Sequence, residues 1–573
     1  MATQVRAQRV GSPIRIEARG LRVVIGKDGK GPVLLNDASL TVLPGELVAI
    51  VGGSGAGKTT LLNALAGVKP PTAGHVTYNG TDLYAHIDYC RSRLGYVPQD
   101  DIVHKDLTVE RTLHYAGKLR LPEASPSERE TLVREALTAL GLERQAKQRV
   151  GSLSGGQRKR ASIGVELLTK PGVFFLDEPT SGLDPATGRE MMRLLRRLAD
   201  AGSTIVVTTH APQDIGGCDR VVFLAPGGLI AYAGAPQEAL AYFNVSGFEQ
   251  IYERVAAVER PQVWAERLRS TNGRAPSQSD SPPAAVQEAM SFKAAAGSGS
   301  FIHQWLVLSQ RNLETLTRNR LTLAILVGSP VMVIMMFAIL FRSGAFKYAD
   351  PSPTSAVMIL FWLAFDGFFF GLTYGLLQIC TEFPIFFRER LVNLKIAPYV
   401  LSKATVLLPM LGMVVAVMLL VLWGFQRLPD GNVALYTKMA LTLLLVGVSA
   451  LALGLLASAA VTSPEQASLA LPMLCFPAVL FSGAILSIPS MAVVGKAIAF
   501  FMPTRYGFEA LGHTAKMDDL FANGASPLGK QLLVEYNDTF AHGLLGQWVI
   551  LAAFAVVFFA GACLVLRRKS VSR

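Results

Sequence analysis

Charge and cysteine are both scarce in this sequence, and each shortage narrows the kind of protein it encodes. Charged residues make up 17% of the 573 residues, whereas 51% are hydrophobic. The five cysteines show no spacing typical of metal ligands, and three of them lie in apolar segments. A zinc site or a disulfide framework is therefore not expected. The first residues, Met-Ala-Thr-Gln-Val-Arg, precede no apolar core, so we expect no cleavable signal peptide.

Charged residues are missing above all from the second half of the chain. They concentrate in the first half, and this division predicts a soluble domain followed by a membrane domain. A net charge of +12 is also found in proteins that bind nucleic acid. Much of this charge flanks apolar spans, where positive loops face the cytoplasm. We therefore expect the lipid bilayer, and no nucleic acid, as a partner.

A glycine-rich loop between a predicted strand and a predicted helix is the clearest pattern in the first half. The apolar run at residues 47–51 predicts a buried parallel strand, and the sequence of residues 61–66 is typical of a helix. Backbone N–H groups of such a loop, together with the helix N-terminus, bind phosphate. We expect Lys58 to contact the β- and γ-phosphates and Thr59 to bind Mg²⁺. The predicted phosphate-binding residues are Gly52, Gly53, Ser54, Gly55, Ala56, Gly57, Lys58, Thr59 and Thr60.

Two carboxylates follow a second apolar run at residues 173–176. Asp177 is placed to hold Mg²⁺, directly or through water, and Glu178 is the candidate general base for the attacking water. A third apolar run, at residues 204–209, ends at His210. This histidine either hydrogen-bonds a γ-phosphate or lies in a solvated loop.

The segment Leu-Ser-Gly-Gly-Gln, residues 153–157, lies between the glycine-rich loop and the two carboxylates. With Gln99, Asp184 and His210, this ordered set resembles the nucleotide-binding domain of ABC transporters. The resemblance implies ATP and Mg²⁺ as cofactors, and a nucleotide held between two cassettes. It implies catalytic roles for Glu178, His210 and Gln99, and magnesium binding by Thr59, Gln99 and Asp177. It also implies that the opposite nucleotide is met by Ser154, Gly155, Gly156, Gln157 and Asp184.

One feature of that family is absent. Its members carry an aromatic residue before the phosphate-binding loop that stacks on adenine, but the first aromatic residue here is Tyr78. Val24 or Ile25 offers only an apolar contact. We therefore expect weak selection among bases, including tolerance of GTP.

The second half contains apolar segments long enough to cross a membrane. Arg388, Arg390, Lys395 and Lys403 place the loop between the second and third segments on the cytoplasmic side, with both termini. We predict an α/β P-loop NTPase (ABC ATPase) domain at residues 1–255, a flexible linker at 256–300, an interfacial amphipathic helix at 301–320 and an all-α polytopic membrane domain of six helices at 321–573. The six predicted spans are residues 321–341, 356–380, 404–425, 439–461, 467–488 and 546–566.

The order of the domains, with the cassette first, resembles the G subfamily of ABC transporters. A charged, aromatic-flanked loop at residues 382–390, Phe-Ser-Gly at 481–483 and the segment at 503–511 also match that subfamily. The resemblance implies that the loop touches the nucleotide domain, although a loop of this composition could instead anchor at the interface. It implies a half-transporter that acts as a homodimer, or as a heterodimer with a similar chain.

In that subfamily the second and fifth spans line a central cavity. Phe370, Ala484 and Ile485 match cavity and plug positions, or else they face lipid and neighbouring helices. Asp366 is a carboxylate near the middle of the second span, which is costly unless it faces water or a partner. It either selects a polar or cationic substrate or is protonated and bonded to a neighbouring helix, and we favour the cavity.

The function expected from these patterns is ATP-driven export of a hydrophobic or amphipathic small molecule or a lipid. The alternatives are a lipid floppase, a polysaccharide exporter and a mechanical signalling ATPase that moves no substrate. Residues 487–546 contain no cysteine, and Glu-Gln-Ile-Tyr-Glu-Arg stands at 249–254 where the family has Asn-Pro-Ala-Asp-Phe. Both departures favour a bacterial relative, and hence a multi-pass protein of the plasma membrane, the inner membrane of a bacterium.

Overall fold

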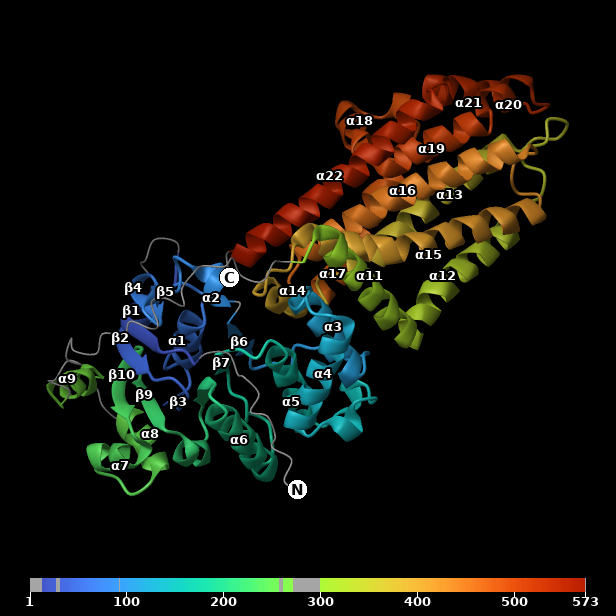
Figure 1. Ribbon diagram of the computed structural model, residues 1–573. Helices are drawn as coiled ribbons and strands as arrows, with labels where there is room; N and C mark the ends of the chain where they lie inside the picture. The colour runs from blue at the N-terminus through green and yellow to red at the C-terminus, as the bar shows by residue number, and fades with distance from the viewer. Residues whose placement is uncertain (1–12, 27–30, 92, 257–260, 272–298, 572–573) are drawn as a thin grey trace, which may run out of the picture. The chain divides into compact units, whose positions relative to one another are not determined.

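The computed structural model describes residues 13–26, 31–91, 93–256, 261–271 and 299–571. It divides into two compact units, Met1–Ser300 with Leu391–Leu394, and Phe301–Arg390 with Lys395–Arg573. We refer to them as the cassette unit and the helical unit. The cassette unit contains both sheets, and the helical unit is built from helices alone among the described residues (Figure 1).

Two sheets form the framework of the cassette unit. The larger sheet has the strand order β10-β9-β3-β8-β7-β6, and the smaller one has the order β2-β1-β4-β5. The three apolar runs predicted as buried parallel strands are β3, β7 and β8, and all three pair in parallel, which confirms that prediction. The strands are β1 (Ile16–Val24), β2 (Val33–Val42), β3 (Leu47–Gly52), β4 (Ala73–Tyr78), β5 (Thr81–Asp82), β6 (Leu94–Val97), β7 (Val173–Leu176), β8 (Thr204–Thr209), β9 (Arg220–Ala225) and β10 (Leu229–Gly234).

The larger sheet is apolar on both faces because each face covers a separate core. Val48 and Ile50 of β3 belong to the core shared with the smaller sheet and α1. Leu47, Ala49 and Val51 alternate with them and face the core formed by α3, α4, α5 and α6. The helices of this unit are α1 (Lys58–Leu65), α2 (Ile87–Arg91), α3 (Val109–Arg120), α4 (Pro126–Leu140), α5 (Gly155–Leu167), α6 (Pro185–Asp200), α7 (Pro236–Phe243), α8 (Phe248–Ala256) and α9 (Gln262–Thr271).

Most of the predicted linker, residues 272–298, lies outside the described residues. The part that is described forms α9, which packs on β10. Trp264 of α9 contacts Phe243 of α7 with ring centroids 5.0 Å apart. Residues 262–271 of the predicted linker therefore pack on the core of the cassette unit.

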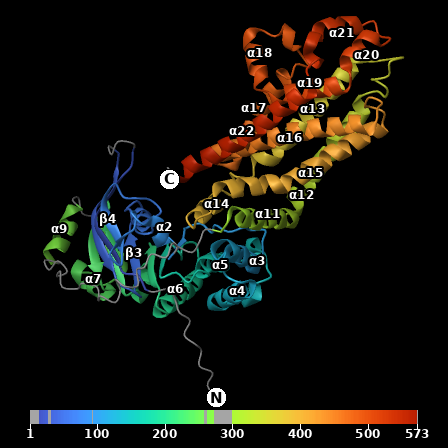
Figure 2. The same ribbon diagram turned by 45° about the horizontal axis from the view of Figure 1, so that its top comes forward.

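Long helices dominate the helical unit, and α13, α15, α16 and α22 run side by side in both views (Figures 1 and 2). Among the described residues, five helices are long and apolar enough to cross a membrane, namely α12, α13, α15, α16 and α22. The helices of this unit are α11 (Phe301–Arg318), α12 (Arg320–Leu340), α13 (Pro353–Leu376), α14 (Phe383–Arg390), α15 (Ile396–Gly424), α16 (Val433–Ala460), α17 (Pro464–Leu480), α18 (Val493–Phe500), α19 (Pro503–Thr514), α20 (Met517–Asn523), α21 (Gly529–Tyr536) and α22 (Leu544–Val571).

The remaining predicted span, at residues 467–488, corresponds to α17, which is shorter than predicted. It has 17 residues and contains Pro472 and Pro477. At 1.5 Å per residue it is about 25 Å long, less than the roughly 30 Å of a bilayer core. The chain turns at Gly483, whose φ of 87° suits glycine, so the last residues of the predicted span are not helical.

Glycines allow α13 and α16 to pack with their backbones in contact. A Cβ atom on Gly371 of α13 would lie 2.2 Å from the carbonyl oxygen of Gly447 on α16. Gly375, one turn further along α13, and Gly454, two turns further along α16, also lie against backbone, and added Cβ atoms there would lie 2.6 and 2.5 Å from backbone oxygens. Small residues at such crossings permit the close contact that holds membrane helices together.

We predict that Gly371→Leu strongly destabilises the helical unit, because the new side chain cannot fit without separating α13 from α16. The loss should exceed about 3 kcal/mol, the upper end of ordinary overpacking. Thermal unfolding of the purified protein in detergent measures it. Gly328→Leu on α12 is the matched control, because no atom lies within 4 Å of the added Cβ. Equal melting temperatures for the two variants would contradict the packing argument.

Candidate nucleotide-binding site

The glycine-rich loop connects β3 to α1, as its sequence predicts. Gly57, the residue before α1, has φ 98°, and a Cβ there would lie 2.6 Å from the carbonyl oxygen of Leu34. Only glycine fits this position. The loop thus leads directly into the N-terminus of α1, where unpaired N–H groups and the helix dipole attract anions.

The ammonium group of Lys58 lies inside this loop. Its Nζ atom donates to the carbonyl oxygens of Gly52 at 2.9 Å and Gly53 at 3.0 Å. Burial lowers the pKa of Lys58, and the negative charges of Glu178 and Asp177 oppose that shift. The carboxylates therefore help to keep a buried cation charged beside the loop.

Asp177 and Thr59 meet at the carboxyl end of the parallel strands. Asp177 is 4% exposed, and its Oδ1 atom accepts from Thr59 Oγ1 at 3.2 Å and from Thr208 Oγ1 at 2.6 Å. A hydroxyl and a carboxylate at this distance offer the oxygen ligands that Mg²⁺ prefers. No group of three or more His, Cys, Asp or Glu side chains that could hold a metal occurs among the described residues. The residues present fit a Mg²⁺ ion held by one carboxylate, one hydroxyl and nucleotide phosphates.

Glu178 carries the backbone irregularity of the site. Its φ is 45°, in the left-handed region that is unfavourable for a residue with a side chain. Its backbone N–H donates to Thr208 Oγ1 at 2.8 Å, which holds this conformation. The strained position turns the Glu178 side chain toward two other predicted site residues.

Gln99, Glu178 and His210, the three residues predicted as catalytic, come together in the structure. Gln99 Nε2 donates to Glu178 Oε2 at 3.3 Å, and His210 Nδ1 lies 3.3 Å from the same oxygen. The three residues follow β6, β7 and β8, which are adjacent in the sheet. A carboxylate held between an amide and an imidazole, next to Asp177, could accept a proton from water.

The Leu-Ser-Gly-Gly-Gln segment forms the start of α5. Ser154 caps this helix, because its Oγ accepts from Gln157 N at 3.3 Å while Gln157 Oε1 accepts from Ser154 N at 3.1 Å. A Cβ on Gly156 would lie 2.3 Å from Thr187 Cγ2 of α6, so this glycine permits the contact of α5 with α6. Ser154 and Gly155 are exposed. The start of α5 is thus an open helix N-terminus.

The phosphate-binding loop and the start of α5 belong to different parts of the cassette unit. Helix α1 packs in the core between the two sheets, whereas α5 packs with α3 and α4 (Figure 1). Asp184 caps α6, and its Oδ1 atom accepts from Ala186 N and Thr187 N at 3.0 Å each. Hydrogen bonds with Thr187, the largest cause, and with Ala186 lower the pKa of Asp184, so this carboxylate stays ionised.

Sequence reasoning missed three residues that hold the site together. Thr208 joins Asp177 to Glu178. Lys159 of α5 donates to the carbonyl oxygens of Pro98 at 3.2 Å and Gln99 at 2.5 Å, which ties the start of α5 to the segment containing Gln99. Asp214 accepts from Thr180 Oγ1 at 2.6 Å and from Thr209 Oγ1 at 2.8 Å. It thereby connects the segment that follows Glu178 to the end of β8, next to His210. Two adjacent threonines in an otherwise apolar strand were the available signal for Thr208.

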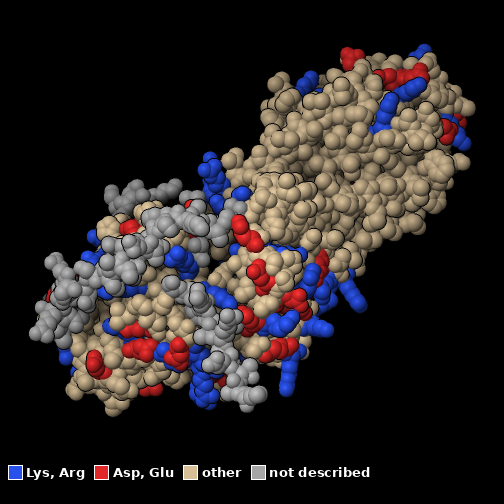
Figure 3. Space-filling model, viewed as in Figure 1, with Lys and Arg blue, Asp and Glu red and all other residues tan. Residues whose placement is uncertain are grey.

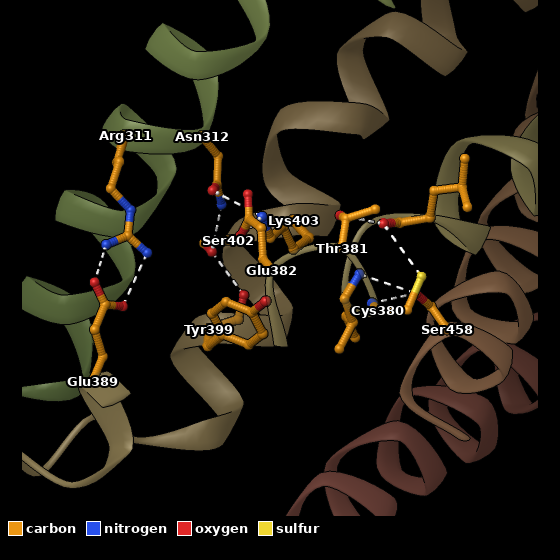
Figure 4. Close-up of polar contacts among 12 residues, drawn as sticks. Arg311, Asn312, Cys380, Thr381, Glu382, Glu389, Tyr399, Ser402, Lys403 and Ser458 are labelled. Carbon is orange, nitrogen blue, oxygen red and sulfur yellow. Dashed lines mark hydrogen bonds and ion pairs between the residues drawn. The ribbon is translucent and has the colours of Figure 1, made fainter. Parts of the chain in front are cut away.

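The predicted loop at residues 382–390 is helical, which corrects the sequence interpretation. Phe383–Arg390 forms α14. The hydrogen bond from Phe386 N to Glu382 O is the first of this helix. The acidic residues at its two ends pair with basic side chains of the helical unit. Glu382 pairs with Lys403, and Glu389 accepts from both terminal nitrogens of Arg311, one of them at 3.1 Å (Figure 4).

Asn312 and Ser402 complete this polar cluster. Asn312 Nδ2 donates to Ser402 Oγ at 2.9 Å, and Lys403 Nζ donates to Asn312 Oδ1 at 3.1 Å (Figure 4). Beside it, Ser458 Oγ accepts the N–H groups of Ile379 and Cys380 at 3.0 Å, where α13 ends. The cluster joins α11, α14 and α15 through charges that are paired.

Three of the four predicted cavity residues are buried within the helical unit. Asp366 is 4% exposed, and Phe370 and Ala484 are each 2% exposed. Ile485 is exposed. The less covered face of α13 consists instead of Met358, Trp362, Phe365, Phe369 and Thr373.

We predict that Thr208→Val lowers ATP hydrolysis about tenfold, because Asp177 loses a partner and the backbone N–H of Glu178 is left unpaired. Phosphate release from MgATP measures this. Thr204→Val, on the same strand, is the matched control, since its hydroxyl bonds Ile14 O and Gly45 N away from the carboxylates. If both variants hydrolyse ATP equally per folded molecule, Thr208 has no special role.

Comparison with known proteins matches both units. A family model described as ABC transporter matches residues 35–181, and one described as ABC-2 type transporter matches residues 303–514. The ABC transporter ATP-binding/permease protein Rv1747 of Mycobacterium tuberculosis is 32% identical over 566 residues, which cover 96% of this chain and 62% of that protein. The chain therefore spans less than two thirds of this relative's length.

Two eukaryotic relatives match different extents of the chain. The broad substrate specificity ATP-binding cassette transporter ABCG2 of Mus musculus is 28% identical over 546 residues, covering 86% of this chain and 81% of that protein. ABC transporter G family member 22 of Arabidopsis thaliana is 41% identical over 224 residues, covering 37% of this chain and 29% of that protein. The match to the Mus musculus transporter covers both units. From the two family matches and their order, the chain belongs to the ABC transporters and has the cassette-first arrangement of a G-type half-transporter.

Proposed function

We propose that two copies of this chain form an exporter that hydrolyses ATP and moves a hydrophobic or amphipathic compound or a lipid across the plasma membrane. The observation that carries the proposal is the meeting of Gln99 and His210 at the Glu178 carboxylate, beside Asp177. Acid–base chemistry on water needs a base and groups that orient it, close to the site of the metal and the phosphates.

Each residue of the site then has a separate role in hydrolysis. Lys58 and the N-terminus of α1 hold the phosphates, and Thr59 and Asp177, with Gln99 as a further ligand, would hold Mg²⁺. When bound, this ion would offset negative charge on the phosphates. Glu178 accepts the proton of the attacking water, while His210 and Gln99 position that water through the shared carboxylate.

The open N-terminus of α5 explains why a second copy is required. The N–H groups of Gly155 and Gly156, the hydroxyl of Ser154 and the helix dipole suit the γ-phosphate of a nucleotide. The phosphate-binding loop of the same chain belongs to another part of the cassette unit. We therefore assign these residues, together with Gln157 and Asp184, to the nucleotide bound by the partner cassette, which gives two sites in a closed dimer.

The substrate path follows the sparsely covered faces of α13 and α17. Rings of Trp362, Phe365 and Phe369 form a series along α13, with successive centroids 5.7 and 6.1 Å apart. On α17, Leu469, Met473 and Phe476 are 70%, 74% and 67% exposed. Two copies that bring these faces together would enclose an apolar, aromatic cavity, which suits an apolar or amphipathic substrate. Asp366 and Phe370 lie on the buried side of α13, behind this face. Ala484 and Ile485 follow the C-terminal end of α17 in the chain.

Vectorial uptake into inverted membrane vesicles tests the proposal, with a fluorescent amphipathic dye and a labelled phospholipid as separate probes. Glu178→Gln keeps the size and hydrogen bonding of the side chain but removes the base. We expect this variant to bind MgATP, to lose nearly all hydrolysis and to show no ATP-dependent uptake. Equal uptake by wild type and variant would refute the coupling of hydrolysis to transport.

A further inference from the structure

A cavity of about 1010 Å³ opens at one end of the helical unit, where α16 and α22 begin and α19 ends. Three lysines line it from separate segments, Lys347 before α13, Lys438 in α16 and Lys516 before α20. Asp430 also lines it and is the sole acidic side chain among its described lining residues. Three positive charges therefore face one negative charge.

Lys438 is the most informative of these residues. It is the only charged residue in the 28 residues of α16, a helix apolar enough to cross a membrane. Ionisable side chains in such helices are rare, and they mark binding sites or pathways when they face a cavity. No carboxylate among the described residues lies within salt-bridge distance of Lys438, nor of Lys347 or Lys516.

Asp519, close to the cavity, forms no ion pair with this lysine cluster. Asp519 is bonded to Tyr348 Oη at 3.0 Å and to Asn523 Nδ2 at 2.6 Å, so its carboxylate is already satisfied. His513 also lines the cavity, and its Nδ1 atom lies 2.9 Å from the carbonyl oxygen of Phe540, which fixes the ring. On the face shown in Figure 3, charged side chains reappear at this end of the helical unit after a long surface almost without them.

The length of α16 allows its start to reach the headgroup layer of a membrane. At 1.5 Å per residue, α16 is about 42 Å long, whereas a bilayer core is about 30 Å thick. Lys438 is the sixth residue of α16, so its long side chain can extend from the apolar core toward the headgroups. Leu435 and Leu544, in the first turns of α16 and α22, line the same cavity. An occupant at this depth has both an apolar and an anionic part within reach.

We propose that this cavity binds the phosphate group of an anionic ester. Three ammonium groups from three segments suit a compact anion with several acceptor oxygens, and lysine binds phosphate as a point charge. Two sources share this chemistry, an anionic phospholipid headgroup in the adjoining leaflet and a soluble phosphate. The site is independent of the ATP site and of the α13 and α17 faces, and so of the proposed function.

Native mass spectrometry of the purified chain, in whatever oligomeric state it adopts, tests the proposal by counting retained phosphatidylglycerol, with phosphatidylcholine as the zwitterionic comparison. The variant Lys347→Gln/Lys438→Gln/Lys516→Gln should retain phosphatidylglycerol about tenfold less well than wild type, since each lysine near a membrane surface contributes to anionic lipid binding. A parallel titration with inorganic phosphate distinguishes a soluble ligand. Binding of inorganic phosphate that is lost in this variant would support the site and assign it to a soluble ester.

The matched control is Arg342→Gln/Lys496→Gln/Lys530→Gln. Arg342 follows α12, Lys496 lies in α18 and Lys530 lies in α21. All three are outside the cavity lining, and the change in net charge is equal. Basal ATP hydrolysis and an elution volume equal to that of the wild type verify that both variants fold. Loss of phosphatidylglycerol in both variants alike would reduce the effect to general surface charge and overturn the proposal. The proposal would also be overturned if the cavity variant retained as much phosphatidylglycerol as the wild type and none of the three proteins bound inorganic phosphate.

Discussion

The buried carboxylate of Asp177 is the constraint on which the arrangement of the cassette unit depends. A carboxylate that is 4% exposed needs hydrogen-bond partners, because an unpaired buried charge is far costlier than a paired one. Thr59 from α1 and Thr208 from β8 supply them. This requirement fixes the phosphate-binding loop at the carboxyl end of the parallel strands. It also forces Glu178, the next residue, into a left-handed conformation that brings it to Gln99 and His210.

The same logic of partnered charge organises the helical unit, although with different residues. Arg311 and Lys403 are almost fully buried, and both are paired with acidic residues at the ends of α14. At the opposite end of α16, Lys438 has no such partner among the described residues, and there the structure offers a cavity instead. Charges that are satisfied internally hold helices together, whereas unsatisfied ones indicate where a ligand belongs.

Motifs and strands could be predicted from the sequence because their signals are local. The phosphate-binding loop, the strands β3, β7 and β8 and the candidate roles of Glu178 and His210 follow from apolar runs with polar residues at their ends, whereas Gln99 is predicted only from the family resemblance. Lys159 could not be found, since its role depends on neighbours 60 and 61 residues away in the chain. The helical periodicity of α13 was masked by its uniform apolarity, so its buried and exposed faces became clear only in the structure.

The central claim of this account is that two copies of the chain complete each nucleotide site, and thiol cross-linking tests it most directly. One tagged copy would carry Ser54→Cys, and a second, differently tagged copy Gly155→Cys, where an added Cβ makes only an ordinary contact at 3.6 Å. In a Glu178→Gln background lacking Cys475 and Cys563, a bifunctional thiol reagent should link the two tags when MgATP is present. Absence of that link, or a link within one chain carrying both cysteines, would contradict the claim.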